Sequence, residues 1–363
     1  MNLARSPYIV EIDLTGVSNV TGSKLELFLG SNIGTANPTY VFEKNIPASN
    51  NLKMYYNISP YIREYFNFTV WQNATGLAYG IATSTNFVVP YEVKRYKDES
   101  GTFTLLGTDT GNFMDGYNYY MDGYNATATR VFLDEGEYFY NYDANIPTSQ
   151  GNGLWGSFDV DINAGETIKY TNLRTGATHT ETAGSDGVKS FARVYLTYAA
   201  DGNKVELFSS SSSLLWTGTF KPECEPKYKP VVIDFVNRYG SWARIFFQKA
   251  NKRSVTVKTN EYKFNPKTLP YTSSDNGQRK EINTNGTETI TLNTGWVNDG
   301  YADYLEQLLL SERVTLLDYD VNPNYTPVKV KSKTLKKQTG LNDGMINYTL
   351  EFEFAFDILN NVI

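Results

Sequence analysis

Apolar and polar residues alternate along much of this chain, and that period of two constrains the fold more than any other feature. The alternation opens in Tyr8–Leu14 (YIVEIDL) and returns in Lys24–Leu29, Ala192–Tyr198 and Lys204–Phe208. Successive side chains of a β-strand point to opposite faces of its sheet, so a half-buried strand has this period. The pattern predicts a mainly β protein with a multidomain β-sandwich or barrel architecture. The last two segments, joined through Asp201-Gly202-Asn203, predict a hairpin.

Two segments carry a helical signal instead. Ser59 followed by Pro60 predicts a short helix with Ser59 as its N-cap, ending near Asn67. Within residues 298–311 the apolar positions have helical spacing, at Tyr301, Tyr304, Leu305, Leu308 and Leu309. This second segment predicts one amphipathic helix that lies against a sheet.

Proline and charge mark the division of the chain into domains. The segment Lys221–Pro230 (KPECEPKYKP) is typical of a semi-rigid linker. We therefore expect an N-terminal β-rich region over residues 1–220, with a division into two subdomains near residues 95–100. A C-terminal β domain over residues 231–363, carrying the helix 298–311, follows the linker.

The clearest alternation lies in Tyr348–Ile358, where the even positions are apolar and most odd positions are polar or acidic. Lysines alternate upstream in Val328–Lys333, and Asn342–Gly344 has the sequence of a three-residue hairpin loop. This loop predicts an antiparallel hairpin with Leu341 facing Met345. That register sets Lys333 opposite Glu353, Lys329 opposite Asp357 and Val330 opposite Phe356 on the core side.

The polar face of this hairpin displays Glu351, Glu353 and Asp357. Two interpretations of the face stay open. It is a solvated sheet surface, or it is a lumen or subunit contact in a ring, where carboxylates keep passing DNA from adhering.

The pentapeptide MDGYN occurs twice, at residues 114–118 and 121–125. Two Asp-Gly pairs predict two turns, with a short aromatic strand over Tyr117–Tyr120 between them. The alternate positions after Asp115 are tyrosines, which cannot ligate calcium as an EF-hand loop does. Tyrosine is over-used at protein interfaces because it buries area and keeps a polar tip. The interface candidates are Tyr117, Tyr119, Tyr120 and Tyr124, with sugar stacking as the alternative use.

Residues that carry common catalytic chemistry are scarce in this chain. It has one histidine, His179, which we expect in a solvated loop, and one cysteine, Cys224, in the linker. These exclude a structural zinc site and an intrachain disulfide. Walker, Rossmann and G-x-S-x-G motifs do not occur. We expect no enzyme activity, no metal and no cofactor; a glycosidase with a carboxylate pair is the enzymatic alternative.

Charge and hydropathy limit the partners. A net charge of −6 argues against non-specific DNA binding. No apolar run is long enough to span a membrane, and the N-terminal MNLARSPYIVEIDLTG lacks the apolar region of a secretory signal. We expect a protein without a membrane span that is made in the cytoplasm.

An ordered set of segments in the C-terminal region carries a family resemblance. The segments are Pro230–Trp242 (PVVIDFVNRYGSW), Phe246–Lys249, Val255–Lys258, Asn260–Lys263, Leu292–Val297, Leu308–Glu312, Leu341–Gly344 and Tyr348–Glu353. In this order they resemble virion structural proteins of tailed phages infecting Bacteroidota, including crAss-like phages. The resemblance covers roughly residues 226–363. The sheet–helix–sheet order of residues 286–356 is also similar to tail-tube and tail-hub domains, a likeness of fold alone.

The resemblance implies a place in the virion, in a tail, neck or portal-proximal ring, after synthesis in the host cytoplasm. The implied partners are further copies of the chain in a ring homo-oligomer, other tail or neck proteins, and phage DNA that passes without specific binding. It implies no catalytic residues. The 28 tyrosines favour the same interpretation, because ring assembly buries them. The alternative is a receptor- or carbohydrate-binding tail protein or adhesin that uses the Tyr/Asp-rich loops near residues 113–142.

Overall fold

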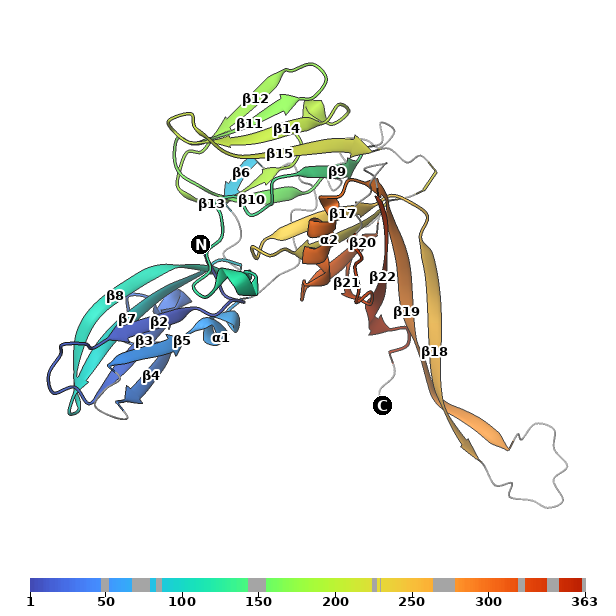
Figure 1. Cartoon of the computed structure of the whole chain (residues 1–363). Helices are drawn as coiled ribbons and strands as arrows, with labels where there is room; N and C mark the ends of the chain where they lie inside the picture. The colour runs from blue at the N-terminus through green and yellow to red at the C-terminus, as the bar shows by residue number, and fades with distance from the viewer. Residues whose placement is uncertain are drawn as a thin grey trace. The chain divides into compact units, whose positions relative to one another are not determined.

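The computed structural model describes residues 1–46, 52–66, 79–82, 87–142, 155–223, 227–228, 230–263, 278–318, 324–337 and 346–360. The chain is mainly β, as the alternation predicts (Figure 1). It forms two compact units. Unit 1 comprises Met1–Glu223 and Val236–Ala243, and unit 2 comprises Cys224–Phe235 and Arg244–Ile363.

The first half of unit 1 is a sandwich of a five-stranded and a two-stranded sheet. The larger sheet has the order β1-β8-β7-β3-β4, and the smaller pairs β2 with β5. The strands are β1 (Asn2–Leu3), β2 (Ile9–Asp13), β3 (Gly22–Leu29), β4 (Tyr40–Asn45), β5 (Lys53–Asn57), β7 (Val89–Glu99) and β8 (Thr102–Met114). The alternating apolar residues form one buried cluster that includes Ile12, Leu25, Leu27, Val93 and Phe113.

The expected division near residues 95–100 is wrong. Residues 95–99 belong to β7, which pairs with β8 from Val89↔Phe113 to Glu99↔Thr102. Ser100 and Gly101 form the tight turn between these strands, both with positive φ, at 54° and 93°. A hairpin held by cross-strand hydrogen bonds is one structural unit, so no boundary falls here.

The first predicted helix is present but begins differently. Helix α1 (Ser59–Arg63) has Ile58 as its N-cap. The Ser59 hydroxyl donates to the Ser6 carbonyl at 2.7 Å and accepts the Tyr8 N–H at 2.8 Å. The serine side chain therefore ties the helix to the N-terminal segment and does not cap its own turn. Asn67 lies outside the described residues.

The second half of unit 1 contains two further sheets, with the orders β10-β13-β6 and β12-β11-β14-β15-β9. The strands are β6 (Tyr79–Ala82), β9 (Glu137–Asn141), β10 (Ser157–Ile162), β11 (Thr167–Asn172), β12 (Thr178–Thr182), β13 (Gly187–Ala192), β14 (Asn203–Phe208) and β15 (Leu214–Glu223). Phe158 of β10 stacks on Trp216 and Phe220 of β15, with ring centroids 5.4 Å and 6.2 Å apart. These rings join the two sheets.

The hairpin predicted between residues 192–198 and 204–208 does not form. Strand β13 ends at Ala192, a 3-10 turn (η4, Leu196–Tyr198) follows, and β14 pairs with β11 and β15. Asn203 holds the crossing segment: its Oδ1 accepts the Tyr195 N–H at 3.0 Å and its Nδ2 donates to the Arg193 carbonyl at 3.1 Å. The strands before and after the turn, β13 and β14, therefore belong to two different sheets.

Unit 2 is built on a seven-stranded sheet with the order β17-β16-β20-β21-β22-β19-β18. The strands are β16 (Val231–Val236), β17 (Trp242–Phe247), β18 (Lys252–Lys263), β19 (Arg279–Val297), β20 (Val314–Asp318), β21 (Asn324–Val330) and β22 (Ile346–Asp357). Helix α2 (Tyr301–Leu309) is the amphipathic helix that the sequence predicts, although shorter than 298–311. Its Tyr304 ring packs on Phe235 of β16, and the Tyr304 hydroxyl donates to the Arg244 carbonyl.

A buried ion pair lies under this helix. Arg244 donates from Nε to Asp234 Oδ1 at 2.7 Å and from Nη2 to Asp234 Oδ2 at 2.9 Å. Neither side chain is exposed. Two parallel hydrogen bonds of this kind fix the register of β16 and β17 as well as neutralising the charges.

The predicted C-terminal hairpin pairs β21 with β22, as expected, but in another register. Val328 faces Phe354, Lys329 faces Glu353 and Val330 faces Phe352, four residues away from the predicted partners. A register shift by an even number of residues keeps every side chain on its face of the sheet. The alternation of apolar and polar residues therefore fits both registers equally well. The predicted loop Asn342–Gly344 lies outside the described residues.

The predicted linker begins later than expected. Lys221, Pro222 and Glu223 belong to β15, where they pair with β9. Residues 224–226 and 229, which include Cys224, lie outside the described residues.

Candidate interaction surfaces

The acidic face of β22 is partly neutralised by lysines across the strand pair. Lys331 Nζ lies 2.8 Å from Glu351 Oε1, and this hydrogen bond raises the lysine pKa. Glu353 lies opposite Lys329 on β21, and Asp357 lies exposed opposite Thr287 on β19. The three predicted carboxylates therefore share one strand, but only Asp357 lies beyond the lysines. The face has mixed charge and is not a uniformly acidic wall.

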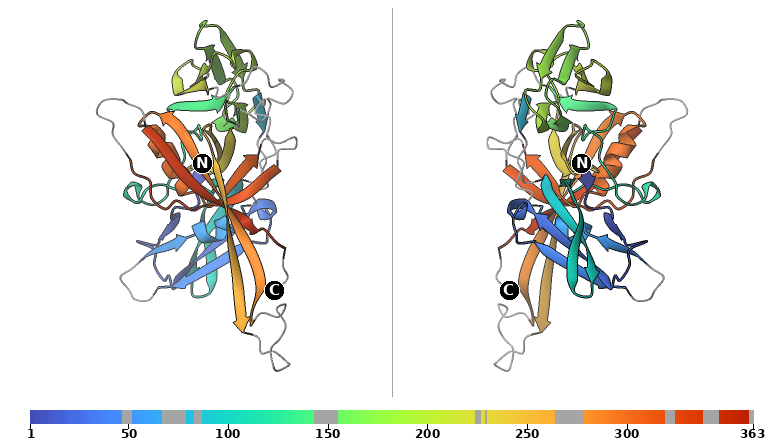
Figure 2. Two further views of the ribbon diagram at one scale, coloured as in Figure 1. Left: turned by 90° about the vertical axis from the view of Figure 1, so that its right-hand side faces the viewer. Right: turned by 90° about the vertical axis from the view of Figure 1, so that its left-hand side faces the viewer.

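The apolar side of β22 leaves the core before the strand ends. Tyr348, Leu350 and Phe352 are buried, whereas Phe356, predicted to be a core residue, is 63% exposed. At the same end of the sheet, β18 and β19 continue together beyond the other strands (Figure 2). Every residue of β18 is exposed. The sheet thus ends in a protruding pair of strands, and none of the described residues of the unit covers the edge strand β18.

The two copies of MDGYN have different environments. In the first, Met114, Asp115 and Gly116 are buried, and the Tyr117 N–H donates to the Arg238 carbonyl at 2.7 Å. A Cβ at Gly116 would lie 2.5 Å from that carbonyl oxygen, so only glycine fits. Tyr117 is half-buried, with the Arg5 guanidinium 4.8 Å from its ring. This copy anchors the loop to the rest of unit 1.

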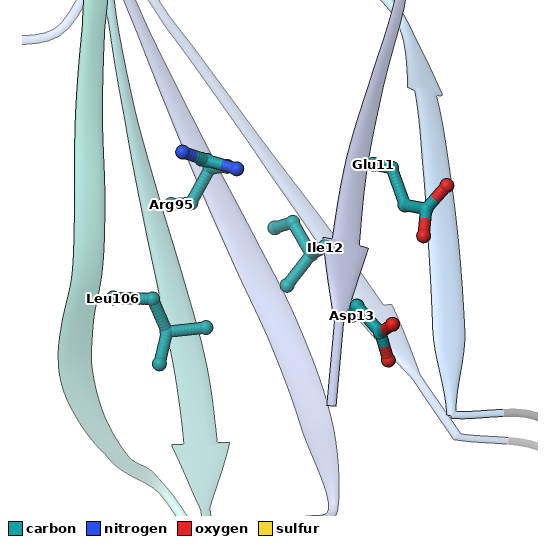
Figure 3. Close-up of a pocket in the computed structure, with 5 residues that line it drawn as sticks. All are labelled: Glu11, Ile12, Asp13, Arg95 and Leu106. Carbon is teal, nitrogen blue, oxygen red and sulfur yellow. The ribbon is translucent and has the colours of Figure 1, made fainter. Parts of the chain in front are cut away.

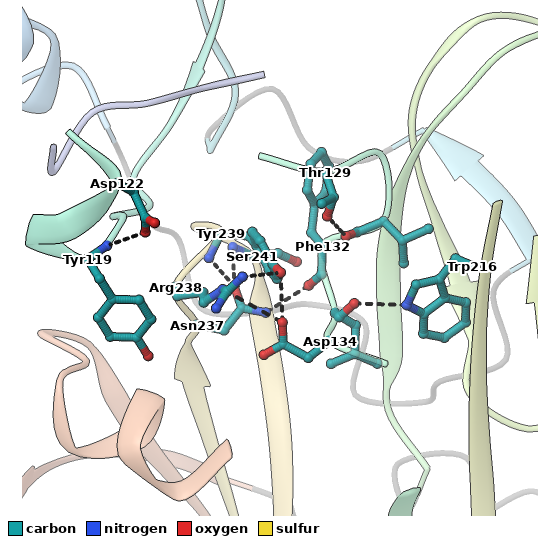
Figure 4. A network of polar contacts seen from close by, with 12 residues as sticks. Tyr119, Asp122, Thr129, Phe132, Asp134, Trp216, Asn237, Arg238, Tyr239 and Ser241 are labelled. Atoms are coloured by element: carbon teal, nitrogen blue, oxygen red, sulfur yellow. Dashed lines mark hydrogen bonds and ion pairs between the residues drawn. The ribbon is translucent and has the colours of Figure 1, made fainter. Parts of the chain in front are cut away.

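The second copy is a surface turn. Residues Tyr120–Asp122 form a 3-10 turn (η2), closed by a hydrogen bond from the Tyr119 N–H to Asp122 Oδ2 at 3.1 Å (Figure 4). Tyr120 is 96% exposed and Tyr124 is 66% exposed. The aromatic strand predicted over Tyr117–Tyr120 does not form, because the backbone turns away after β8. Of the four candidate tyrosines, Tyr120 and Tyr124 are the most accessible.

Arg238 and Tyr239 lie beside this loop (Figure 4). The Tyr239 hydroxyl donates to Asp134 Oδ1 at 2.7 Å, and burial together with this carboxylate raises its pKa to about 12. The Arg238 guanidinium lies 5.9 Å from the Tyr119 ring. Asp134 thus accepts a structural hydrogen bond.

His179 lies in strand β12 and not in a loop, which corrects the expectation from sequence. Its ring stacks on Tyr195 with centroids 3.9 Å apart, and Nε2 lies 2.7 Å from Glu181 Oε1. In the described part of the chain, no group of three His, Cys, Asp or Glu side chains is arranged to hold a metal ion. No helix among the described residues is long and apolar enough to cross a membrane.

A groove beside β2 was not indicated by the sequence. Glu11, Ile12 and Asp13 of β2 form one side, and Arg95 of β7 and Leu106 of β8 form the other, around a volume of about 380 Å³ (Figure 3). Ile12 points toward Arg95 and Leu106, and the two carboxylates point away. The alternation that marks β2 as a strand carries no information about which of its edges stays open.

A scan against models of known protein families finds no match to this chain, and a search of curated proteins finds no significant relative.

Proposed function

We propose that this chain is a structural subunit of a tailed-phage virion that assembles with itself into a tail or neck ring. The implied neighbours are adjacent virion proteins and the DNA that passes through the ring, and the role is mechanical and not enzymatic. The site of action is the virion, after synthesis in the host cytoplasm.

The observation that carries this proposal is the β18–β19 hairpin. Strand β18 has twelve residues, all exposed, and forms one edge of the seven-stranded sheet. Long, flat, unpaired edges promote strand pairing with other chains, and soluble proteins usually cover or interrupt them. Exposed Val255 and Val257 on β18 add apolar surface to this edge. A subunit that completes its sheet in a neighbouring copy has a use for such an edge.

The mixed-charge face of Glu351, Glu353 and Asp357 is the second proposed contact. Alternating charges on a flat face suit register-specific docking of an adjacent ring, since like charges across a wrong register repel. In this arrangement Asp357, beyond the two lysines, is the carboxylate placed to face passing DNA.

The first test is the mass of the purified chain over a concentration series, by light scattering, with negative-stain images of any large species. A discrete closed oligomer supports the ring, and its mass gives the number of subunits. A chain that remains monomeric at all concentrations, alone and with purified neck or tail proteins, contradicts the proposal.

A carbohydrate- or receptor-binding tail protein is the second candidate, favoured by the exposed Tyr120 and Tyr124 around Asp122. Aromatic faces beside a carboxylate are a common arrangement for holding a sugar ring. Glycan-array binding that is lost in Tyr120→Ala and Tyr124→Ala, but retained in the control Tyr262→Ala on β18, would establish this function.

A further inference from the structure

Among the described strands, β2 pairs on one edge only, with β5, and the hydrogen bonds to β5 show which edge is open. Ile58 N–H donates to the Tyr8 carbonyl and Leu14 N–H to the Leu52 carbonyl, both between β2 and β5 or their direct extensions. Antiparallel strands form backbone hydrogen bonds through every second residue. The N–H and C=O groups of the even-numbered residues of β2 therefore point toward β5. The N–H and C=O groups of Ile9, Glu11 and Asp13 therefore point to the opposite edge.

Asn125 already occupies the first of these three positions. Its Oδ1 accepts the Ile9 N–H at 2.6 Å, and its Nδ2 donates to the Ile9 carbonyl at 3.0 Å. One side chain thus supplies the donor and the acceptor that a neighbouring strand would supply. The backbone groups of Glu11 and Asp13 remain at the mouth of the groove that Arg95 and Leu106 border (Figure 3).

Strand β18 likewise pairs on one edge only, with β19, in the part of the chain that the structure describes. Val257 pairs with Gly286 of β19, but the Gly286 carbonyl accepts the N–H of Ile358 on the far side. The Val257–Gly286 pair is therefore of the non-hydrogen-bonded kind, and the backbone of Val257 points away from β19. By the same alternation Val255 does so too. Their side chains are 57% and 62% exposed, at Val255 and Val257 respectively.

The two edges are complementary in polarity as well as in hydrogen bonding. Added parallel to β2, with Val257 beside Ile12, strand β18 sets Val255 beside Val10 and Lys258 beside Asp13. The valines then lie on the Ile12 side, toward exposed Leu106, and the lysine lies on the carboxylate side. Strand β18 (KRSVTVKTNEYK) carries four basic residues and one acidic residue, whereas β2 carries only the acidic Glu11 and Asp13.

Asp13 is an anion at any ordinary pH. Hydrogen bonds from Thr15 and then from Lys53 lower its pKa to about 2. The docking strand therefore meets a fixed negative charge beside the backbone groups of Glu11 and Asp13, with which no described strand pairs on this edge.

We propose that strand β18 of one copy of this chain adds to the open edge of strand β2 in a second copy, in the groove between Glu11–Asp13 and Arg95–Leu106. The backbone hydrogen bonds supply the affinity, and the valines and Lys258 set the register. The contact joins two different surfaces, so it propagates from copy to copy and closes into a ring where the rotation allows. This inference rests on the proposed self-association and names the surfaces that perform it.

A labelled synthetic peptide of residues 252–263, titrated against the full chain by fluorescence anisotropy, tests the edge directly. We expect saturable binding to the wild-type chain and to Glu11→Ala, which keeps its N–H. Glu11→Pro removes that N–H, which β5 does not use, and weakens binding at least tenfold. A peptide with Val257→Pro loses binding, whereas Thr256→Pro, whose N–H points away from β2, retains most of it. Equal binding of the two proline peptides overturns the inference. This comparison uses only the wild-type chain, so it does not depend on the folding of a protein variant.

The intact chain separates this inference from the proposed function. Oligomers that are lost in Val257→Pro, with an unchanged unfolding midpoint, support both. Oligomers that persist in Val257→Pro and in Glu11→Pro overturn the inference and leave the ring proposal standing. A chain that stays monomeric overturns both.

Discussion

Asn125 acts as a one-residue strand against Ile9, with hydrogen bonds of 2.6 Å and 3.0 Å to both backbone groups of that residue. The asparagine belongs to the exposed copy of MDGYN, and Ile9 opens β2. A side chain from a surface turn thus limits how much of a sheet edge is available for pairing.

We expect Asn125→Ala to lower the free energy of unfolding by about 1 kcal/mol for each hydrogen bond lost. Asn125→Asp keeps an acceptor for the Ile9 N–H and loses the donor, so its effect is intermediate. Urea unfolding of the three proteins measures the series. An Asp variant as destabilised as the Ala variant would show that the acceptor contributes nothing.

The observed register of β21 and β22 makes a second prediction. Lys329→Glu places two acidic side chains opposite each other and destabilises the chain by about 0.5 kcal/mol. Adding Glu353→Lys restores the lost stability, because the charges are exchanged across the same pair. Adding Asp357→Lys instead is the matched control, and rescue by that variant would favour the register predicted from sequence.

The buried pair of Asp234 and Arg244 makes the largest stability prediction. Asp234→Ala leaves an uncompensated guanidinium in the interior and costs about 3–5 kcal/mol. The double variant Asp234→Leu with Arg244→Met replaces both charges by apolar groups and recovers most of that loss. Lys331→Ala, which breaks the exposed pair with Glu351, is the control and shifts the urea midpoint little. A double variant no more stable than Asp234→Ala would contradict this account.

Glu166 gives a prediction about acid stability. Both of its carboxylate oxygens accept hydrogen bonds from Arg130, which hold its pKa below the ordinary 4.5. A pKa that folding lowers stabilises the folded state above the unfolded pKa, and this contribution is lost as the pH falls through the folded pKa. We therefore expect the midpoint of urea unfolding to drop as the pH decreases from about 5 to about 3.

Glu166→Gln tests the assignment. The variant is less stable at neutral pH and loses less stability on acidification than the wild-type chain. Glu135→Gln, at an exposed position, leaves the wild-type slope unchanged. If Glu166→Gln loses as much stability on acidification as the wild-type chain does, another group is responsible for the acid sensitivity.

The two copies of MDGYN illustrate what a local sequence pattern cannot predict. Both copies of MDGYN carry the same turn residues, and the sequence correctly indicates that the chain turns there. It does not distinguish the buried copy at Gly116, against the Arg238 carbonyl, from the exposed copy at Gly123. The contact partner lies more than a hundred residues away, and no periodicity reports it.

The hairpins show the same limit. Alternation marked residues 192–198 and 204–208 as extended, but Asn203 and the 3-10 turn at Leu196–Tyr198 send the chain from one sheet to another. In the C-terminal pair, alternation and charge placed β21 beside β22 with the correct faces. A slip of four residues satisfies both equally well, so the pattern could not choose between registers.

The amino-acid sequence by itself determined the mainly β class, the helix at Tyr301–Leu309 and the inner face of β22 up to Phe352, because these depend on local periodicity and on burial of one face. Only the tertiary structure decided the register of β21 on β22, the bidentate pair of Asp234 with Arg244, and which strand edges stay open at β2 and β18. Those features depend on which distant strands compete for the same hydrogen bonds, and the energy of that choice is spread over the whole sheet.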